Sequence, residues 1–167
     1  MNWFFITLGY SGLFPKAPGT AGSIVALLLG MWILIAFNAQ TLFLASLLIS
    51  IIAIKSIDKY EASSNIHDDK RIVIDELVGM WFALSVAPAV TINFNALGML
   101  ENGFLIQSVL SFLLFRYFDI TKPSIIGRID RETKGGLGVV GDDVIAGFVA
   151  GILSAIIWQG IVTLQGL

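Results

Sequence analysis

Apolar residues fall into five runs along the chain, separated by polar or charged segments. The pattern predicts five membrane-spanning helices, at about residues 24–37, 41–57, 72–90, 103–118 and 143–164. Some of these runs are shorter than the roughly 20 residues that a full crossing needs, so tilt, local thinning or polar flanks must complete them. The expected fold is all-α, a polytopic membrane helical bundle with about four to five transmembrane helices.

Short connections add detail to this bundle. Only Asn38, Ala39 and Gln40 separate the first two runs, which predicts an αα-hairpin. Residues 12–23 (GLFPKAPGTAGS) predict a loop, in which Thr20 or Ser23 could cap the following helix. Free N–H groups at that helix start could also bind an anion.

Composition places the bundle in a membrane. Of the 167 residues, 56% are hydrophobic and 13% are charged. In soluble domains about half of the residues are apolar and about a quarter are charged. The net charge of −2 lacks the basic excess that binds nucleic-acid backbones. The absence of cysteine excludes disulfides, thiolate nucleophiles and zinc–thiolate sites. We expect one domain over residues 1–167 that lies in the bilayer and binds no nucleic acid.

Charged residues gather in two segments, Lys55–Glu76 and Phe115–Gly147. With five spans, every Lys and Arg falls on one side of the membrane, and the connections 38–40 and 88–102 contain none. The positive-inside rule assigns that side to the cytoplasm. Because the acidic residues of both segments lie on the same side, the sequence predicts an acidic site at the cytoplasmic face.

Asp75 and Glu76 lie near the start of an apolar helix, where a carboxylate that faces lipid is strongly unfavourable. They are expected to face a polar cavity, a partner charge or a metal, although one of them could complement the helix dipole instead. Gly79 shares a helical stripe with Asp75 and would allow close helix contact, as would Gly147 and Gly151 in their G-x-x-x-G spacing.

A second acidic group follows in the later charged segment. Arg116, Asp119 and Lys122 share a face if the fourth helix continues that far, and Asp142 and Asp143 are predicted to open the fifth helix after GGLGVVG. Clustered carboxylates suit Mg²⁺, and basic neighbours suit phosphoryl oxygens. Metal-dependent phosphate-ester hydrolysis fits this set. A small ion-coupled carrier is the alternative, although its carboxylates would lie mid-span.

Four segments resemble the motifs of a known family, in the same order and at similar spacing. They are PGTAGS (18–23), IVIDELVGMW (72–81), FRYFDITKP (115–123) and GGLGVVGDDVIAG (135–147), and the family is phosphatidylglycerophosphatase A. The resemblance implies a phosphatase of bacterial phospholipid synthesis in the cytoplasmic (inner) membrane, with Mg²⁺ as cofactor. Its lipid substrate would be phosphatidylglycerophosphate, hydrolysed to phosphatidylglycerol and phosphate. Another lipid phosphate, phosphatidic acid or a polyprenyl phosphate, is the alternative substrate.

Site roles follow as hypotheses. The family motifs match Asp75, Glu76, Asp119, Lys122, Asp142 and Asp143. We expect catalytic roles for Asp75, Glu76, Asp119, Asp142 and Asp143, with Asp75, Glu76, Asp142 and Asp143 as Mg²⁺ ligands. Arg116, Lys122 and Lys134 are expected to bind the substrate phosphate. His67 and Asp68, in a loop that also resembles the family's, and Thr20 are further candidates.

Overall fold

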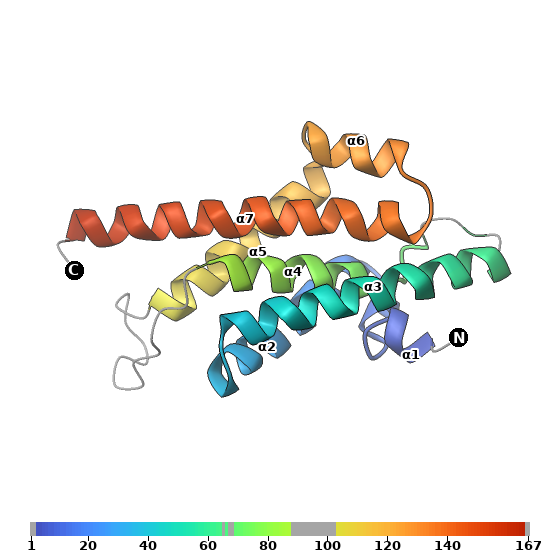
Figure 1. Ribbon diagram of the computed structural model, residues 1–167, viewed down its shortest axis with the longest axis horizontal. Helices are drawn as coiled ribbons and strands as arrows, with labels where there is room; N and C mark the ends of the chain where they lie inside the picture. Colours follow the sequence, from blue (N-terminus) through green and yellow to red (C-terminus); the bar gives the residue numbers. More distant parts are fainter. Residues whose placement is uncertain (1–2, 65, 67–68, 88–102, 166–167) are drawn as a thin grey trace.

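The computed structural model describes residues 3–64, 66, 69–87 and 103–165, and the chain folds into helices with no strand in this part (Figure 1). The elements are α1 (Trp3–Ile6), the 3-10 helix η1 (Ser11–Leu13), α2 (Pro18–Ala36), α3 (Ala39–Ser64), α4 (Ile74–Val86), α5 (Gly103–Thr121), α6 (Ile125–Glu132) and α7 (Gly136–Gln165). The all-α prediction is confirmed.

Four helices, α2, α3, α5 and α7, are long and apolar enough to cross a membrane. Large apolar side chains such as Leu28, Leu48 and Ile156 are more than half exposed on them, as lipid-facing side chains would be. The described part of α4 has 13 residues, about 20 Å of helix. The fifth expected span, 72–90, therefore corresponds to a shorter helix, and residues 88–90 lie outside the described part.

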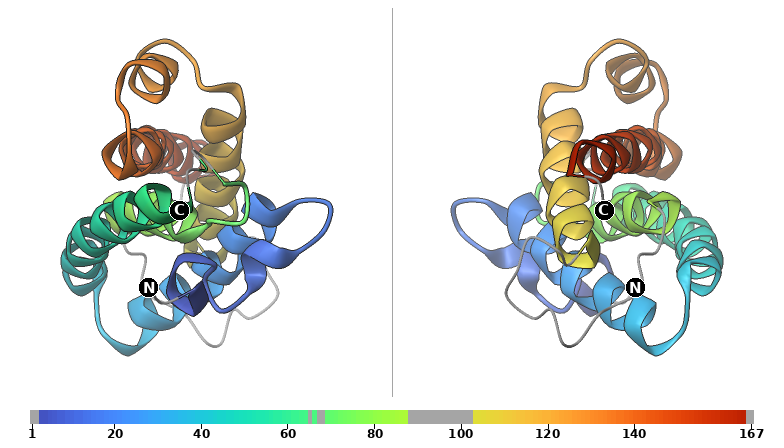
Figure 2. Two further views of the ribbon diagram at one scale, coloured as in Figure 1. Left: turned by 90° about the vertical axis from the view of Figure 1, so that its right-hand side faces the viewer. Right: turned by 90° about the vertical axis from the view of Figure 1, so that its left-hand side faces the viewer.

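α4 is the centre of the bundle. It packs against α2, α3, α5 and α7, which surround it in the end-on views of Figure 2. Nearly all of its residues are buried, including the large side chains Met80, Trp81 and Phe82. Because Asp75 and Glu76 lie in the first turn of α4, the position of this helix brings both carboxylates in among the surrounding helices.

Glycines allow α4 and α7 to touch through their backbones. A Cβ atom on Gly147 would collide with the carbonyl oxygen of Gly79, and one on Gly151 would lie 2.6 Å from the carbonyl oxygen of Ala83. On the other side, a Cβ atom on Gly79 would lie 2.5 Å from the ring of Phe115. The close contact predicted from Gly79, Gly147 and Gly151 is therefore confirmed.

The hairpin between α2 and α3 is also confirmed. The carboxamide oxygen of Asn38 accepts hydrogen bonds from the backbone N–H of Thr41 (2.8 Å) and from its hydroxyl (3.1 Å). Asn38 thus caps the first turn of α3. The charged ends lie at the opposite end of the bundle, where α3 ends and α4 and α7 begin (Figure 1).

The predicted loop 12–23 is wrong in its second half. α2 already begins at Pro18, and its N-cap residue Ala17 makes no side-chain cap hydrogen bond. Proline suits the first helical position, because its fixed φ is helical and its missing N–H is not needed there. Thr20 and Ser23 therefore lie inside α2 and do not cap it.

The glycine-rich GGLGVVG segment is helical, which corrects the expectation that Asp142 and Asp143 open the last helix. α7 begins at Gly136, so both carboxylates lie in its second turn. Gly135 has a left-handed φ of +73°, and the Asp58 carboxylate on α3 accepts the N–H of Gly136 at 2.7 Å. This contact from α3 fixes the start of α7.

Replacing Asp58 with Ala is expected to lower the thermal unfolding midpoint of the detergent-solubilised protein. The N–H of Gly136 at the start of α7 would lose its hydrogen-bond acceptor, and losing a helix cap lowers the free energy of unfolding by about 1 kcal/mol. Asp58→Asn keeps an acceptor oxygen and should unfold close to the wild type. Equal midpoints for the Ala variant and the wild type would show that this cap does not stabilise the fold.

Candidate active site

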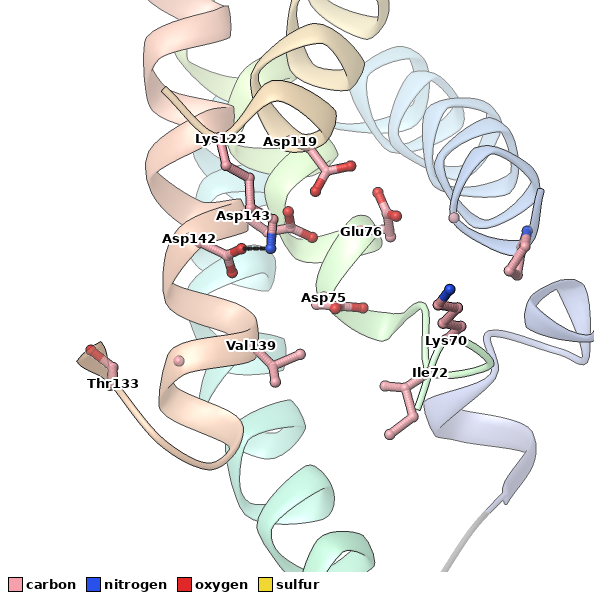
Figure 3. A pocket seen from close by; sticks show the side chains of 13 residues that line it. Lys70, Ile72, Asp75, Glu76, Asp119, Lys122, Thr133, Val139, Asp142 and Asp143 are labelled. Atoms are coloured by element: carbon pink, nitrogen blue, oxygen red, sulfur yellow. Dashed lines mark ion pairs between the residues drawn. The ribbon is translucent and has the colours of Figure 1, made fainter. Parts of the chain in front are cut away.

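A cavity of about 380 Å³ opens at the charged end of the bundle (Figure 3). Its walls come from α2, α4, α5 and α7 and from the segments that precede α4 and α7. The lining residues are Pro18, Gly19, Lys70, Ile72, Asp75, Glu76, Asp119, Lys122, Thr133, Gly138, Val139, Asp142 and Asp143. Five carboxylates from three helices thus meet in one polar space.

Glu76 is held by the first turns of α2. Its Oε2 accepts a hydrogen bond from the Ser23 hydroxyl at 2.8 Å, and its Oε1 lies directly against Gly19, where a Cβ atom would collide with it. Gly19 and Ser23 are four residues apart and share one face of α2. The PGTAGS segment therefore contributes to the site by packing on a carboxylate.

Arg116 joins two of the carboxylates. Its Nη1 donates to Glu76 Oε2 at 2.6 Å, to Asp119 Oδ2 at 2.7 Å and to the Ser23 hydroxyl at 3.3 Å. All three charged side chains are at most 15% exposed, so the ion pairs are short, charge-assisted and largely screened from water. Arg116 does not line the cavity; it lies behind the acidic wall.

Lys122 faces the carboxylates of α7. It follows directly after the end of α5, with a left-handed φ of +42°, and its ammonium group lies 2.7 Å from Asp142 Oδ2. The Lys122 side chain is 33% exposed, whereas that of Asp142 is 4% exposed. The Lys122 side chain therefore borders the cavity and is partly open to solvent while it pairs with Asp142.

Three carboxylates are close enough together to share one cation. Oxygen atoms of Glu76, Asp119 and Asp143 all lie within 4.8 Å of one another. Among the described residues, five carboxylates line the cavity together with two lysines, Lys70 and Lys122, so acidic charge is in excess there even with Arg116 behind the wall. An all-oxygen, acidic set of this kind suits a hard divalent cation.

The predicted site residues mostly meet in this cavity. Asp75, Glu76, Asp119, Lys122, Asp142 and Asp143 line it, whereas Arg116, Thr20 and the exposed Lys134 do not. His67 and Asp68 lie outside the described residues. The group that fits a cation includes Asp119 and omits Asp75 and Asp142, so it differs in part from the expected ligand set.

Three contributors were missed in the sequence: Gly19, Ser23 as a partner of Glu76, and Lys70. The i, i+4 spacing of Gly19 and Ser23 was a usable signal, since it places both residues on one helix face. Lys70 had no comparable signal, because it follows a charged loop whose path is set only by tertiary contacts.

Comparison with known proteins identifies the family to which this sequence is similar. The model of Phosphatidylglycerophosphatase A matches residues 4–158. Phosphatidylglycerophosphatase A of Escherichia coli (strain K12) is 33% identical over 154 residues, covering 90% of this chain and 81% of that protein. The Haemophilus influenzae protein of the same name is 31% identical over 143 residues, covering 86% and 80%.

A third relative, from Bacteroides thetaiotaomicron, is named as a candidate phosphatidylinositol-3-phosphatase. It is 33% identical over 150 residues, covering 87% of this chain and 86% of that protein. No solved structure matches the chain significantly. The family match over nearly the whole length and the acidic cavity agree, and the chain belongs to the phosphatidylglycerophosphatase A family of phosphoric monoester hydrolases.

Proposed function

We propose that this protein is a Mg²⁺-dependent phosphatase that hydrolyses phosphatidylglycerophosphate to phosphatidylglycerol and phosphate. The observation that carries the proposal is the convergence of Glu76, Asp119 and Asp143 beside the ammonium group of Lys122. Phosphate-monoester hydrolysis is among the slowest uncatalysed reactions, so its enzymes need strong charge neutralisation and a well-positioned nucleophile.

Glu76, Asp119 and Asp143 would hold the Mg²⁺ ion. When bound, the ion supplies charge neutralisation for the phosphoryl group and orients a water molecule. Arg116 binds two of these carboxylates, so we assign it the role of positioning them. This role replaces the phosphate binding that we expected from the sequence. Ser23 supports Glu76 in the same way.

The remaining cavity residues act on the substrate and on water. Lys122, partly exposed beside Asp142, would bind oxygens of the reacting phosphate. Asp75 lines the cavity, and its buried Oδ1 has no hydrogen-bond partner among the described residues. It is therefore placed to accept a proton from the water that attacks phosphorus. As the bond from phosphorus to the glycerol oxygen breaks, that oxygen takes up a proton from solvent water and leaves as the alcohol.

Orientation in the membrane follows from charge. The Lys and Arg residues all lie either in the cavity-side ends of α3 and α5, in α6, or in the segments that connect helices at that end. By the positive-inside rule this charge supports a cavity that faces the cytoplasm, in the bacterial inner membrane under this proposal. A lipid headgroup could reach it there without leaving the bilayer.

A second candidate function is hydrolysis of a different lipid phosphomonoester. The Bacteroides thetaiotaomicron relative, whose name points to a phosphoinositide, favours this alternative. The carboxylates and Lys122 would act on the phosphoryl group in the same way, and only the headgroup would differ.

Phosphate release by the detergent-purified protein tests both candidates. We expect release from phosphatidylglycerophosphate to rise with Mg²⁺, to fall to background with EDTA and to return when Mg²⁺ is added in excess. Phosphatidic acid, phosphatidylinositol 3-phosphate and a polyprenyl phosphate should be poorer substrates. Preference for one of these would change the substrate, and full release in EDTA would overturn the metal dependence.

A further inference from the structure

The segment just before α4 forms a firmly held turn, Asp69–Val73. The Asp69 carboxylate accepts a hydrogen bond from the Tyr60 hydroxyl at 2.6 Å and from Arg71 Nη2 at 2.6 Å. The backbone N–H of Ile72 donates to the carbonyl oxygen of Asp69 at 2.8 Å. The Arg71 guanidinium holds the pKa of the Asp69 carboxyl well below its usual range, so the carboxylate stays charged at neutral pH.

The N-terminal segment braces this turn from outside. The N–H of Val73 donates to the carbonyl oxygen of Ile6 at 3.0 Å, and the Arg71 guanidinium lies 5.1 Å from the centre of the Trp3 ring. Gly12 packs directly on the carbonyl oxygen of Arg71. These contacts engage Asp69 and Arg71 with the protein, and they leave the intervening Lys70 to project from a fixed backbone.

Lys70 points into the active-site cavity from this turn. It lines the cavity and makes no hydrogen bond or ion pair with another residue in the described part of the chain. Figure 3 shows it on the opposite side of the cavity from Lys122 and Asp142, with Asp75 and Glu76 between them. The cavity therefore presents two lysines on opposite walls.

Phosphatidylglycerophosphate carries two phosphates on one glycerol: a terminal monoester, which reacts, and a phosphodiester, which stays on the lipid. The monoester belongs beside the convergent carboxylates and Lys122 under the function proposed above, on which this step rests. We infer that Lys70 binds the phosphodiester of the same headgroup, and that it thereby selects a lipid with two phosphates over one with a single phosphate. An ammonium group suits such an anionic oxygen as a point charge.

Lys70→Ala should separate two lipid substrates. We expect KM for phosphatidylglycerophosphate to rise about tenfold, the size of one charge-assisted hydrogen bond, with kcat nearly unchanged. Turnover of phosphatidic acid, which lacks the second phosphate, should not change. Lys59→Ala, which removes an exposed lysine of α3 outside the cavity lining, controls for net charge and should resemble the wild type. Lys70→Arg should restore most of the affinity.

If Lys70→Ala lowered kcat/KM equally for phosphatidylglycerophosphate and for phosphatidic acid, the inference would be overturned, because Lys70 would then act on the reacting phosphate or on folding. An unchanged KM for phosphatidylglycerophosphate would also overturn it.

Binding of the product tests the inference without turnover. Calorimetric titration with short-chain phosphatidylglycerol, which retains the phosphodiester alone, should show about tenfold weaker binding to Lys70→Ala than to the wild type. Binding of inorganic phosphate should be the same for both proteins. If the wild type hydrolyses no lipid but the product result holds, the proposed function fails and the Lys70 site stands. Equal phosphatidylglycerol binding by both proteins refutes the Lys70 site.

Discussion

Asp143→Asn is expected to lower turnover of phosphatidylglycerophosphate by about a thousandfold, with the fold intact. The Asp143 side chain is buried, at 3% exposure, and its carboxylate oxygen lies within 4.8 Å of those of Glu76 and Asp119. Asn keeps the size of Asp and loses its charge. A hard cation would then be held by one anionic ligand fewer, and such an ion contributes several kcal/mol of charge stabilisation in the transition state.

In this variant, the rate of phosphate release should fall together with the affinity for Mg²⁺, and titration calorimetry measures that affinity. Glu132→Gln is the matched control, since it also removes one carboxylate by an isosteric change, but on an exposed side chain of α6 that does not line the cavity. That control should keep wild-type activity. If Asp143→Asn retained turnover while its thermal unfolding matched the wild type, Asp143 would not be a metal ligand.

The membrane helices could be predicted because lipid imposes a simple rule. A helix that faces hydrocarbon must be apolar over its exposed surface, so composition alone marks it. Leu48 and Leu113 are exposed apolar residues of this kind. By the same rule, Asp75 and Glu76 had to face a protected polar space, and both line the cavity.

The partners of Arg116 could be predicted only in part. Its i, i+3 spacing to Asp119 indicates a shared helix face, and the ion pair between them is 2.7 Å long. Glu76 and Ser23 are 40 and 93 residues away in the chain, and only the packing of α2, α4 and α5 brings them together. Sequence spacing within one helix carries no information about such contacts, so the sequence predicted Arg116 as a phosphate ligand and did not predict its contacts with Glu76 and Ser23.

The GGLGVVG segment misled because glycine is unfavourable in an isolated helix by about 1 kcal/mol relative to alanine. Here packing overrides that preference. A Cβ atom on Gly136 would collide with the carbonyl oxygen of Ile54, and one on Gly138 with that of Thr133. These glycines permit close contacts around the first turn of α7, and the cap from Asp58 completes the helix start.

Gly147→Ala is expected to lower activity by about a hundredfold and to destabilise the protein by about 1–3 kcal/mol, the usual range for overpacking. The added methyl group would collide with the carbonyl oxygen of Gly79, and a backbone atom cannot turn aside as a flexible side chain can. α4 and α7 would have to separate. Since α4 carries Glu76 and α7 carries Asp143, the two ligands would move apart, and displacements of about 1 Å can lower rates by about two orders of magnitude.

Gly160→Ala isolates this effect from helix propensity. It is the same substitution on the same helix, at a position where a Cβ atom would meet nothing within 4 Å. Both variants gain whatever alanine contributes to the helix, so only the contact with α4 differs between them. Phosphate release and thermal unfolding should be unchanged or slightly improved for Gly160→Ala and impaired for Gly147→Ala. Similar behaviour of the two variants would mean that the α4–α7 contact tolerates a methyl group and does not set the spacing of the carboxylates.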